Sequence, residues 1–128
     1  MKKHNLAFLD IETTGLDVAI HEIIEIGAIL TTPDLKIIEK IDIKILPEKI
    51  ENADQVSLKI NGYNEEDWRD AKSLKEVMRT LAKKLEGFIL VGQNVAFDSG
   101  FLEKAFVVAG VKNTMHYHKL DTISIAWA

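Results

Sequence analysis

Residues 6–12 read Leu-Ala-Phe-Leu-Asp-Ile-Glu, an apolar run that ends in two acids two positions apart. The run predicts a central strand over residues 5–11 that is buried on both faces of a sheet. Because successive side chains of a strand point to opposite faces, Asp10 and Glu12 should share one face and lie close together. Such acids repel each other unless one is protonated or a divalent cation is shared between them. Taken alone, the tripeptide is better explained by two solvated acids at an exposed strand end.

The sequence beyond this strand predicts an α/β fold. Two more strands are expected at residues 22–30 and 36–46, and the short links imply an antiparallel meander. Ser73, with Glu76 three positions later, forms a capping box at the start of a helix. The later elements are expected at residues 54–60, 65–69 and 74–85 (helical), 88–91 (strand), 98–109 (helix) and 117–125 (strand). This order predicts a mixed sheet with helices packed on its faces.

Length and composition favour one globular domain without a membrane segment. The chain has 128 residues, 47% of them hydrophobic, and no apolar run near the ~20 residues that span a bilayer. A cytoplasmic location is therefore expected. The absence of cysteine leaves oxygen and nitrogen as the only metal ligands, and a net charge of −4 argues against a broad basic surface for duplex binding.

A second polar block lies far along the chain. Residues 92–98, Gly-Gln-Asn-Val-Ala-Phe-Asp, follow a predicted buried strand and open a helix, and Thr13-Thr14-Gly15 directly follows the first two acids. Two other families carry acids after a strand. Haloacid-dehalogenase phosphatases have Asp-x-Asp, whereas the second acid here is Glu, and sugar-kinase-type ATPases have an Asp-Gly-Thr pattern that this chain lacks.

The two blocks together resemble the motifs of the DEDD exonuclease superfamily, which has the ribonuclease H-like fold. Its proofreading members include the epsilon subunit of bacterial DNA polymerase III. FLDIETTGL at residues 8–16, with HEIIEIGAIL at 21–30, is similar to the first exonuclease motif and the strand after it. GQNVAFDSGFL at residues 92–102 is similar to the second motif.

The resemblance implies that Asp10, Glu12 and Asp98 are catalytic metal ligands. In the complete site they would share two Mg²⁺ or Mn²⁺ ions, for which oxygen ligands are suited. Two such ions promote in-line phosphodiester cleavage, and the product would be a 5′-mononucleotide. Without the resemblance, Asp98 would be explained as a helix N-cap.

The resemblance also suggests residues that bind the substrate. Those that shape the pocket for the terminal nucleotide or orient the second motif are Thr13, Thr14, Leu16, Asn94 and Phe97. Phe101 is better explained by core packing. Glu25 is explained equally well as a neighbour of the metal site or as an ion-paired strand residue.

The third motif of the superfamily supplies a fourth carboxylate together with a His or Tyr. His116 and Asp121 formally match His-x₄-Asp, and Tyr117 and Asp121 match Tyr-x₃-Asp. In the family this motif lies further along the chain, at a helix, so we expect residues 1–128 to be an incomplete exonuclease domain. Weak metal binding, little or no activity alone, and self-association through an uncovered sheet face would follow.

The expected substrates are single-stranded or frayed 3′ ends of DNA or RNA, and a DNA polymerase is an expected partner. A non-catalytic module that binds nucleic acid or a polymerase is the alternative, with a phosphohydrolase of another family as a weaker one. Retention of three clustered acids argues against a degenerate site, because such acids are costly to fold around without metal.

Overall fold

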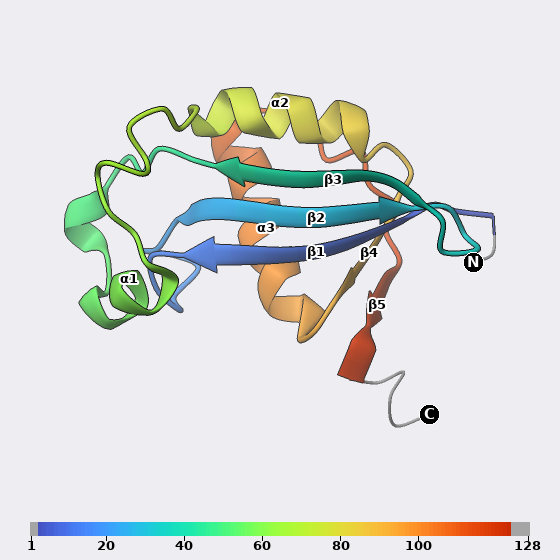
Figure 1. Ribbon diagram of the computed structural model, residues 1–128, viewed down its shortest axis with the longest axis horizontal. Helices are drawn as coiled ribbons and strands as arrows, with labels where there is room; N and C mark the ends of the chain where they lie inside the picture. Colours follow the sequence, from blue (N-terminus) through green and yellow to red (C-terminus); the bar gives the residue numbers. More distant parts are fainter. Residues whose placement is uncertain (1–2, 124–128) are drawn as a thin grey trace.

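The computed structural model describes residues 3–123, which form a five-stranded sheet with strand order β3-β2-β1-β4-β5 (Figure 1). The first three strands are β1 (Leu6–Thr13), β2 (Ile23–Thr31) and β3 (Ile37–Lys44). Strand β1 pairs with β2 and β2 pairs with β3, both antiparallel. The predicted meander is therefore confirmed, and β1 is central as expected.

The second half of the chain extends the sheet on the other side of β1. Strand β4 (Ile89–Gly92) pairs with β1 in parallel, and β5 (Lys119–Asp121) pairs with β4 in parallel. Helix α3 (Val95–Ala109) connects these two strands. The strand–helix–strand unit completes the mixed sheet that the sequence predicted.

One face of the sheet carries the core. Helix α3 crosses behind the strands in Figure 1, and α2 (Leu74–Lys84) runs beside β3. Both helices contribute to one cluster of buried apolar side chains that includes Ala7, Leu9 and Ile11 of β1. The expectation that β1 is buried on both faces was wrong, because its burial alternates and Asp10 is exposed. Helices α2 and α3 therefore cover one face, and the face that carries Asp10 is open.

Local differences from the expected elements have identifiable causes. Residues 65–70 form turns rather than a helix. The last strand, β5, is shorter than expected and ends at Asp121. Thr122 and Ile123 after it are helical, and the Asp121 carboxylate accepts the Ile123 backbone N–H at 2.9 Å. Residues 124 and 125 of the expected strand lie outside the described range.

Two caps position the helices near the site. Ser73 caps α2 as predicted, and its hydroxyl accepts the Glu76 N–H at 3.2 Å. Helix α3 begins at Val95, three residues earlier than expected, so Asp98 lies in its first turn and is not its N-cap. The remaining elements are a short 3₁₀ helix (Ile50–Asn52) and α1 (Gln55–Asn61). Within residues 3–123, no helix is both long enough and apolar enough to span a bilayer.

Candidate active site

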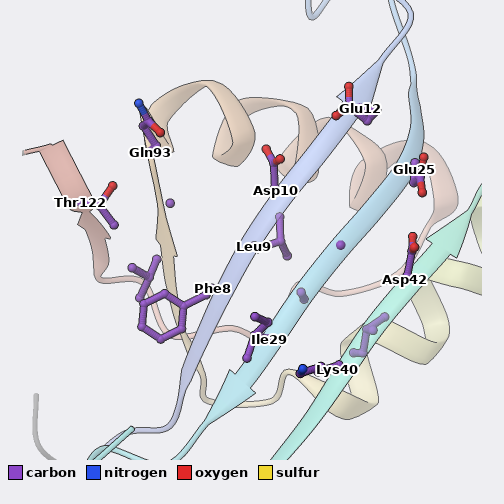
Figure 2. A pocket seen from close by; sticks show the side chains of 15 residues that line it. Phe8, Leu9, Asp10, Glu12, Glu25, Ile29, Lys40, Asp42, Gln93 and Thr122 are labelled. Carbon is purple, nitrogen blue, oxygen red and sulfur yellow. The ribbon is translucent and has the colours of Figure 1, made fainter. Parts of the chain in front are cut away.

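Two acids project from the open face of β1. Figure 2 shows Asp10 and Glu12 on the same side of the strand, as the alternation of side chains predicted. Burial raises the pKa of Glu12, and the nearby Asp10 charge raises it further. Beyond Glu12 the pairing of β1 with β2 shifts register, which marks the end of the regular ladder. The two acids therefore lie in the part of β1 that continues beyond its pairing with β4.

Asp98 meets these acids from a different element. Its side chain lies in the first turn of α3, and only 5% of the residue is exposed. Burial, followed by the charges of Asp10 and Glu12, raises the pKa of Asp98 to about 7. Neither a hydrogen-bond donor nor a cation of the described residues offsets these effects. The Asp98 carboxylate is thus a buried acid that repels two other acids 86 or more positions away in sequence (98 − 12 = 86).

Gly92 makes room for the Asp98 carboxylate. A Cβ at position 92 would lie 3.3 Å from Oδ2 of Asp98 and 3.5 Å from the carbonyl oxygen of Leu9. Leu9 directly precedes Asp10, so the end of β4 brings the α3 carboxylate alongside β1. A glycine between the two elements allows this approach.

The three carboxylates form an open arrangement. Within residues 3–123, no three Asp, Glu or His side chains already enclose a space that would hold a metal ion. The donor set nevertheless fits a hard divalent cation, because it consists of carboxylate oxygens with one buried and uncompensated member. A cation bound between the acids would remove the repulsion that raises the pKa of Asp98.

A groove of about 640 Å³ lies over the open face beside these acids. Figure 2 shows Asp10, Glu25 and Asp42 in its wall, on three neighbouring strands, with Gln93 and Thr122 on the far side. The parallel pairing of β4 with β5 brings Gln93 and Thr122 together. The two residues are far apart in the sequence, and no local pattern indicated that they would line one groove.

Of the two roles that the sequence left open for Glu25, the structure shows the ion-paired strand residue. It lies opposite Glu12 in the β1–β2 ladder, and Lys44 Nζ is 3.4 Å from its carboxylate. Burial raises its pKa, a hydrogen bond with Asp42 adds to this, and the Lys44 charge opposes it. Glu25 is therefore an ion-paired strand residue that also faces the acidic side of the groove.

The Thr13-Thr14-Gly15 turn is held by its own hydroxyl groups. Thr13 Oγ1 donates to the Gly15 carbonyl at 2.6 Å, and Thr14 Oγ1 accepts the Glu22 N–H at 2.9 Å. A Cβ on Gly15 would lie 2.4 Å from the His21 ring, so any other residue there would require that ring to shift. The turn presents Leu16, which is 80% exposed.

Asn61 is a neighbour of this turn, and the sequence did not predict its contact with Thr13. Its Nδ2 donates to the Thr13 carbonyl at 2.9 Å, and the Asp54 N–H donates to the Thr14 carbonyl at 2.7 Å. Helix α1 is thereby fastened to the end of β1. The only sequence signal was the turn-forming Asn61-Gly62 pair, which gave no indication of a contact across 48 positions.

The second block adopts a tight entry into α3. Asn94 has a left-handed backbone (φ 55°), makes no side-chain cap, and accepts the Phe97 N–H at 3.0 Å through its carbonyl group. Phe97 packs against Phe101 with ring centroids 4.9 Å apart. Phe101 is buried in the core, as the simpler explanation predicted.

The formal third motif is divided between the two ends of β5. The His116 N–H bonds to the Phe88 carbonyl before β4, whereas Asp121 pairs with Gly92 at the end of β4. Their partners Phe88 and Gly92 are four positions apart along β4, which is roughly 13 Å at about 3.3 Å per strand residue. Tyr117 is 77% exposed and stacks on His116. His116 and Tyr117 therefore do not accompany Asp121 to a common site.

Comparisons with known proteins identify relatives of this arrangement. A sequence model of the exonuclease family matches residues 7–128. A DNA polymerase III PolC-type protein of Thermotoga petrophila is 37% identical over 94 residues, which cover 73% of this chain and 7% of that protein. The corresponding protein of Mycoplasmopsis pulmonis is 29% identical over 120 residues, covering 91% of this chain and 8% of its own length. The chain thus spans less than a tenth of these relatives.

Solved structures share the fold at lower sequence identity. Exonuclease I without ligand has a TM-score of 0.83 and 17% identity, and the match covers 97% of this chain and 30% of that one. A structure described as the zinc-ion-bound form of an E. coli exonuclease I–single-stranded DNA complex has a TM-score of 0.82, 16% identity, and coverage of 97% and 29%.

Proposed function

This chain belongs to the exonuclease family and has the ribonuclease H-like fold of DEDD nucleases, and from this premise we propose that it removes 5′-mononucleotides from 3′ ends of DNA or RNA. We propose further that residues 1–128 lie within a single exonuclease domain. Divalent cations, Mg²⁺ or Mn²⁺, would be held by Asp10, Glu12 and Asp98. These assignments extend to this chain what the family match supports in general, a nuclease.

The single observation that carries the proposal is the raised pKa of Asp98. Burial, followed by the charges of Asp10 and Glu12, raises the pKa of Asp98 to about 7, so the acids of β1 lie close enough to act on the acid of α3. Keeping a buried acid in this state lowers the stability of the fold, so a role that requires the acids is a better explanation than chance. The chemistry that bound Mg²⁺ or Mn²⁺ supplies is activation of water and neutralisation of charge developing on the phosphate.

The chain's own residues would bind and orient the substrate. The turn at Thr13 and Thr14 adjoins the acids and exposes Leu16, whose apolar side chain can contact the terminal base. Asn94 fixes the entry to α3, and Phe97 lies three residues further along that helix. These contacts would place the last phosphodiester bond beside Asp10 and Glu12.

Relatives named as DNA polymerase III proteins support a replicative polymerase as partner, and with it a cytoplasmic location. The complex of exonuclease I with single-stranded DNA supports a single strand as substrate. We expect cleavage by residues 1–128 alone to be slow. Among the described residues, only the charges of Asp10 and Glu12 affect the pKa of Asp98, so no fourth carboxylate joins them. His116 and Asp121 lie apart, so no general base from the described part of the chain accompanies the acids. Loss of a general base typically costs about 10²–10⁴ in rate.

A non-catalytic module that binds nucleic acid or a polymerase is the second candidate. The open groove beside the acids would suit binding without cleavage. Metal binding separates the two candidates, since a ligand that binds only the native state raises the unfolding temperature. If the chain is an exonuclease, Mn²⁺ should raise the unfolding temperature of the unmodified chain more than that of the Asp10→Ala variant. If it is a binding module, Mn²⁺ should have the same effect on both proteins.

The decisive experiment follows cleavage of 5′-labelled single strands at high protein concentration with Mn²⁺. Stepwise shortening from the 3′ end is expected for linear DNA or RNA, with no cutting of a closed single-stranded circle, and EDTA or Asp10→Ala should abolish it. Nicking of the circle would refute exonuclease action. Absence of shortening, together with equal Mn²⁺ stabilisation of the unmodified chain and of Asp10→Ala, would favour the binding module.

A further inference from the structure

Asp121 lies at the end of β5 and joins three segments near the acids. Its Oδ2 accepts the Val95 N–H at 3.2 Å, and its Oδ1 accepts the Ile123 N–H at 2.9 Å. In the β4–β5 ladder it is paired with Gly92, the residue over which the Asp98 carboxylate lies. We propose that Asp121 is a positioning residue that holds the first turn of α3, and with it Asp98, against the end of β1; this inference rests on the proposed function.

The start of α3 needs such a partner. The first N–H groups of a helix have no carbonyl partner within the helix, and a side-chain oxygen normally accepts one of them. Asn94 has a left-handed backbone and its side chain makes no cap, so Asp121 supplies the missing acceptor from 26 positions away. Val95 and Asp98 are three residues apart, within one helical turn, so an acceptor fixed to Val95 restrains Asp98.

The carboxylate suits this position better than a neutral amide does. Asp121 uses both oxygens as acceptors of backbone N–H groups, whereas an asparagine has only one acceptor oxygen. A negative charge is also favourable at a helix N-terminus. Asp121 is not itself one of the acids that raise the pKa of Asp98, so it acts through the helix and not as a fourth member of the cluster.

Asp121 also positions the far wall of the groove. Its bond to the Ile123 N–H turns the chain after β5, and Thr122 within that turn lines the groove with Gln93. One carboxylate therefore connects the start of α3 with the groove wall. Loss of that carboxylate should disturb both parts of the site, and loss of a helix cap elsewhere should disturb neither.

The test compares Asp121→Ala with Ser73→Ala, which removes the cap of α2. The dissociation constant for Mn²⁺ and the unfolding free energy are measured for the unmodified chain and both variants. Asp121→Ala is expected to weaken Mn²⁺ binding about tenfold, within the 10–100-fold range seen when a group that orients a metal ligand is lost. Ser73→Ala is expected to change Mn²⁺ affinity less than twofold while lowering the unfolding free energy through loss of the helix cap.

Asp121→Asn is the second variant, for use if Asp121→Ala does not fold. It should weaken Mn²⁺ binding by a smaller factor than Asp121→Ala does. Equal Mn²⁺ affinity in the Asp121 variants and Ser73→Ala would overturn the inference alone. Absence of Mn²⁺ binding by the unmodified chain, with no further change in Asp10→Ala, would overturn the proposed function and this inference with it.

Discussion

The two ends of the parallel strands β4 and β5 carry titratable clusters of opposite character. At the carboxyl ends, Asp98 meets Asp10 and Glu12 beside Gly92. At the other end, His116 lies next to His4 with ring centroids 4.4 Å apart and next to His118 at 4.8 Å. Both clusters consist of metal-ligating residue types, yet the structure treats them differently.

The histidine end is a stack of rings on the surface. Desolvation, followed by the charges of His4 and His118, lowers the pKa of His116. Its Nδ1 already accepts the His118 N–H at 3.0 Å. The carboxylate end instead keeps a buried acid under repulsion beside a groove. Both clusters contain residue types that bind metals, so the residue types alone do not indicate a metal site. The end of the strands at which a cluster lies is the more informative feature.

The largest expected effect is loss of metal binding at the carboxylate end. Asp98→Ala, or Asp10→Ala, should weaken Mn²⁺ binding at least about 100-fold, because each removes a negatively charged ligand and not merely its support. Calorimetric titration with Mn²⁺ at pH 8 measures this. Unchanged Mn²⁺ affinity in Asp98→Ala would show that the raised pKa of that acid has no connection with metal.

The stability of the metal-free chain should depend on pH through Asp98. Its pKa is about 7 in the folded chain and 3.8 is the ordinary value, so the folded state binds a proton more tightly than the unfolded state. The unfolding free energy should therefore fall as pH rises from about 4 to about 7, with a slope of at most about 1.4 kcal/mol per pH unit from this group. Asp98→Asn should lose this part of the slope and be the more stable protein at pH 7.5.

Urea denaturation of both proteins between pH 4 and 8 gives the difference directly, which removes the contributions of other acids. Mn²⁺ should reverse the effect in the unmodified chain at pH 8, because the ion favours the ionised acid. If the difference in unfolding free energy between the two proteins is the same at every pH from 4 to 8, the pKa of Asp98 is not raised in the folded chain.

A smaller change should follow from filling the space at Gly92. In Gly92→Ala the new methyl group would lie 3.3 Å from Asp98 Oδ2, so the carboxylate must move by a few tenths of an ångström. We expect a roughly three- to tenfold loss of Mn²⁺ affinity, in line with the modest end of the effect of disturbing a ligand's support. Gly100→Ala is the matched control, since no atom lies within 4 Å of its added Cβ.

The smallest effect is expected at the histidine end. His116→Ala removes one member of the ring stack but leaves the carboxylates untouched, so Mn²⁺ affinity at pH 8 should change less than twofold. The same variant tests the formal His-x₄-Asp motif, because a residue that acts on water at the site would reduce cleavage by about 10²–10⁴. Loss of cleavage in His116→Ala would contradict the division of that motif between the two ends of β5.

Much of the fold followed from local patterns. The alternation at Ile41 and Ile43, the cap at Ser73 and the buried run before Gly92 predicted elements that the structure contains. Two of the expectations that failed have a clear physical reason. Helices α2 and α3 cover one face of the sheet, so β1 is not buried on both faces, and the Asp121 carboxylate turns the chain after three residues of β5.

The sequence by itself determined which residue types end β1 and open α3, and the alternation of a strand placed Asp10 and Glu12 on one face. Only the tertiary structure decided that Asp98 meets them while His116 and Asp121 are separated. Helical and strand periodicities act over a few residues, whereas the parallel pairing of β4 with β1 and the helix between β4 and β5 set which distant ends coincide. The repulsion that raises the pKa of Asp98 arises from that pairing.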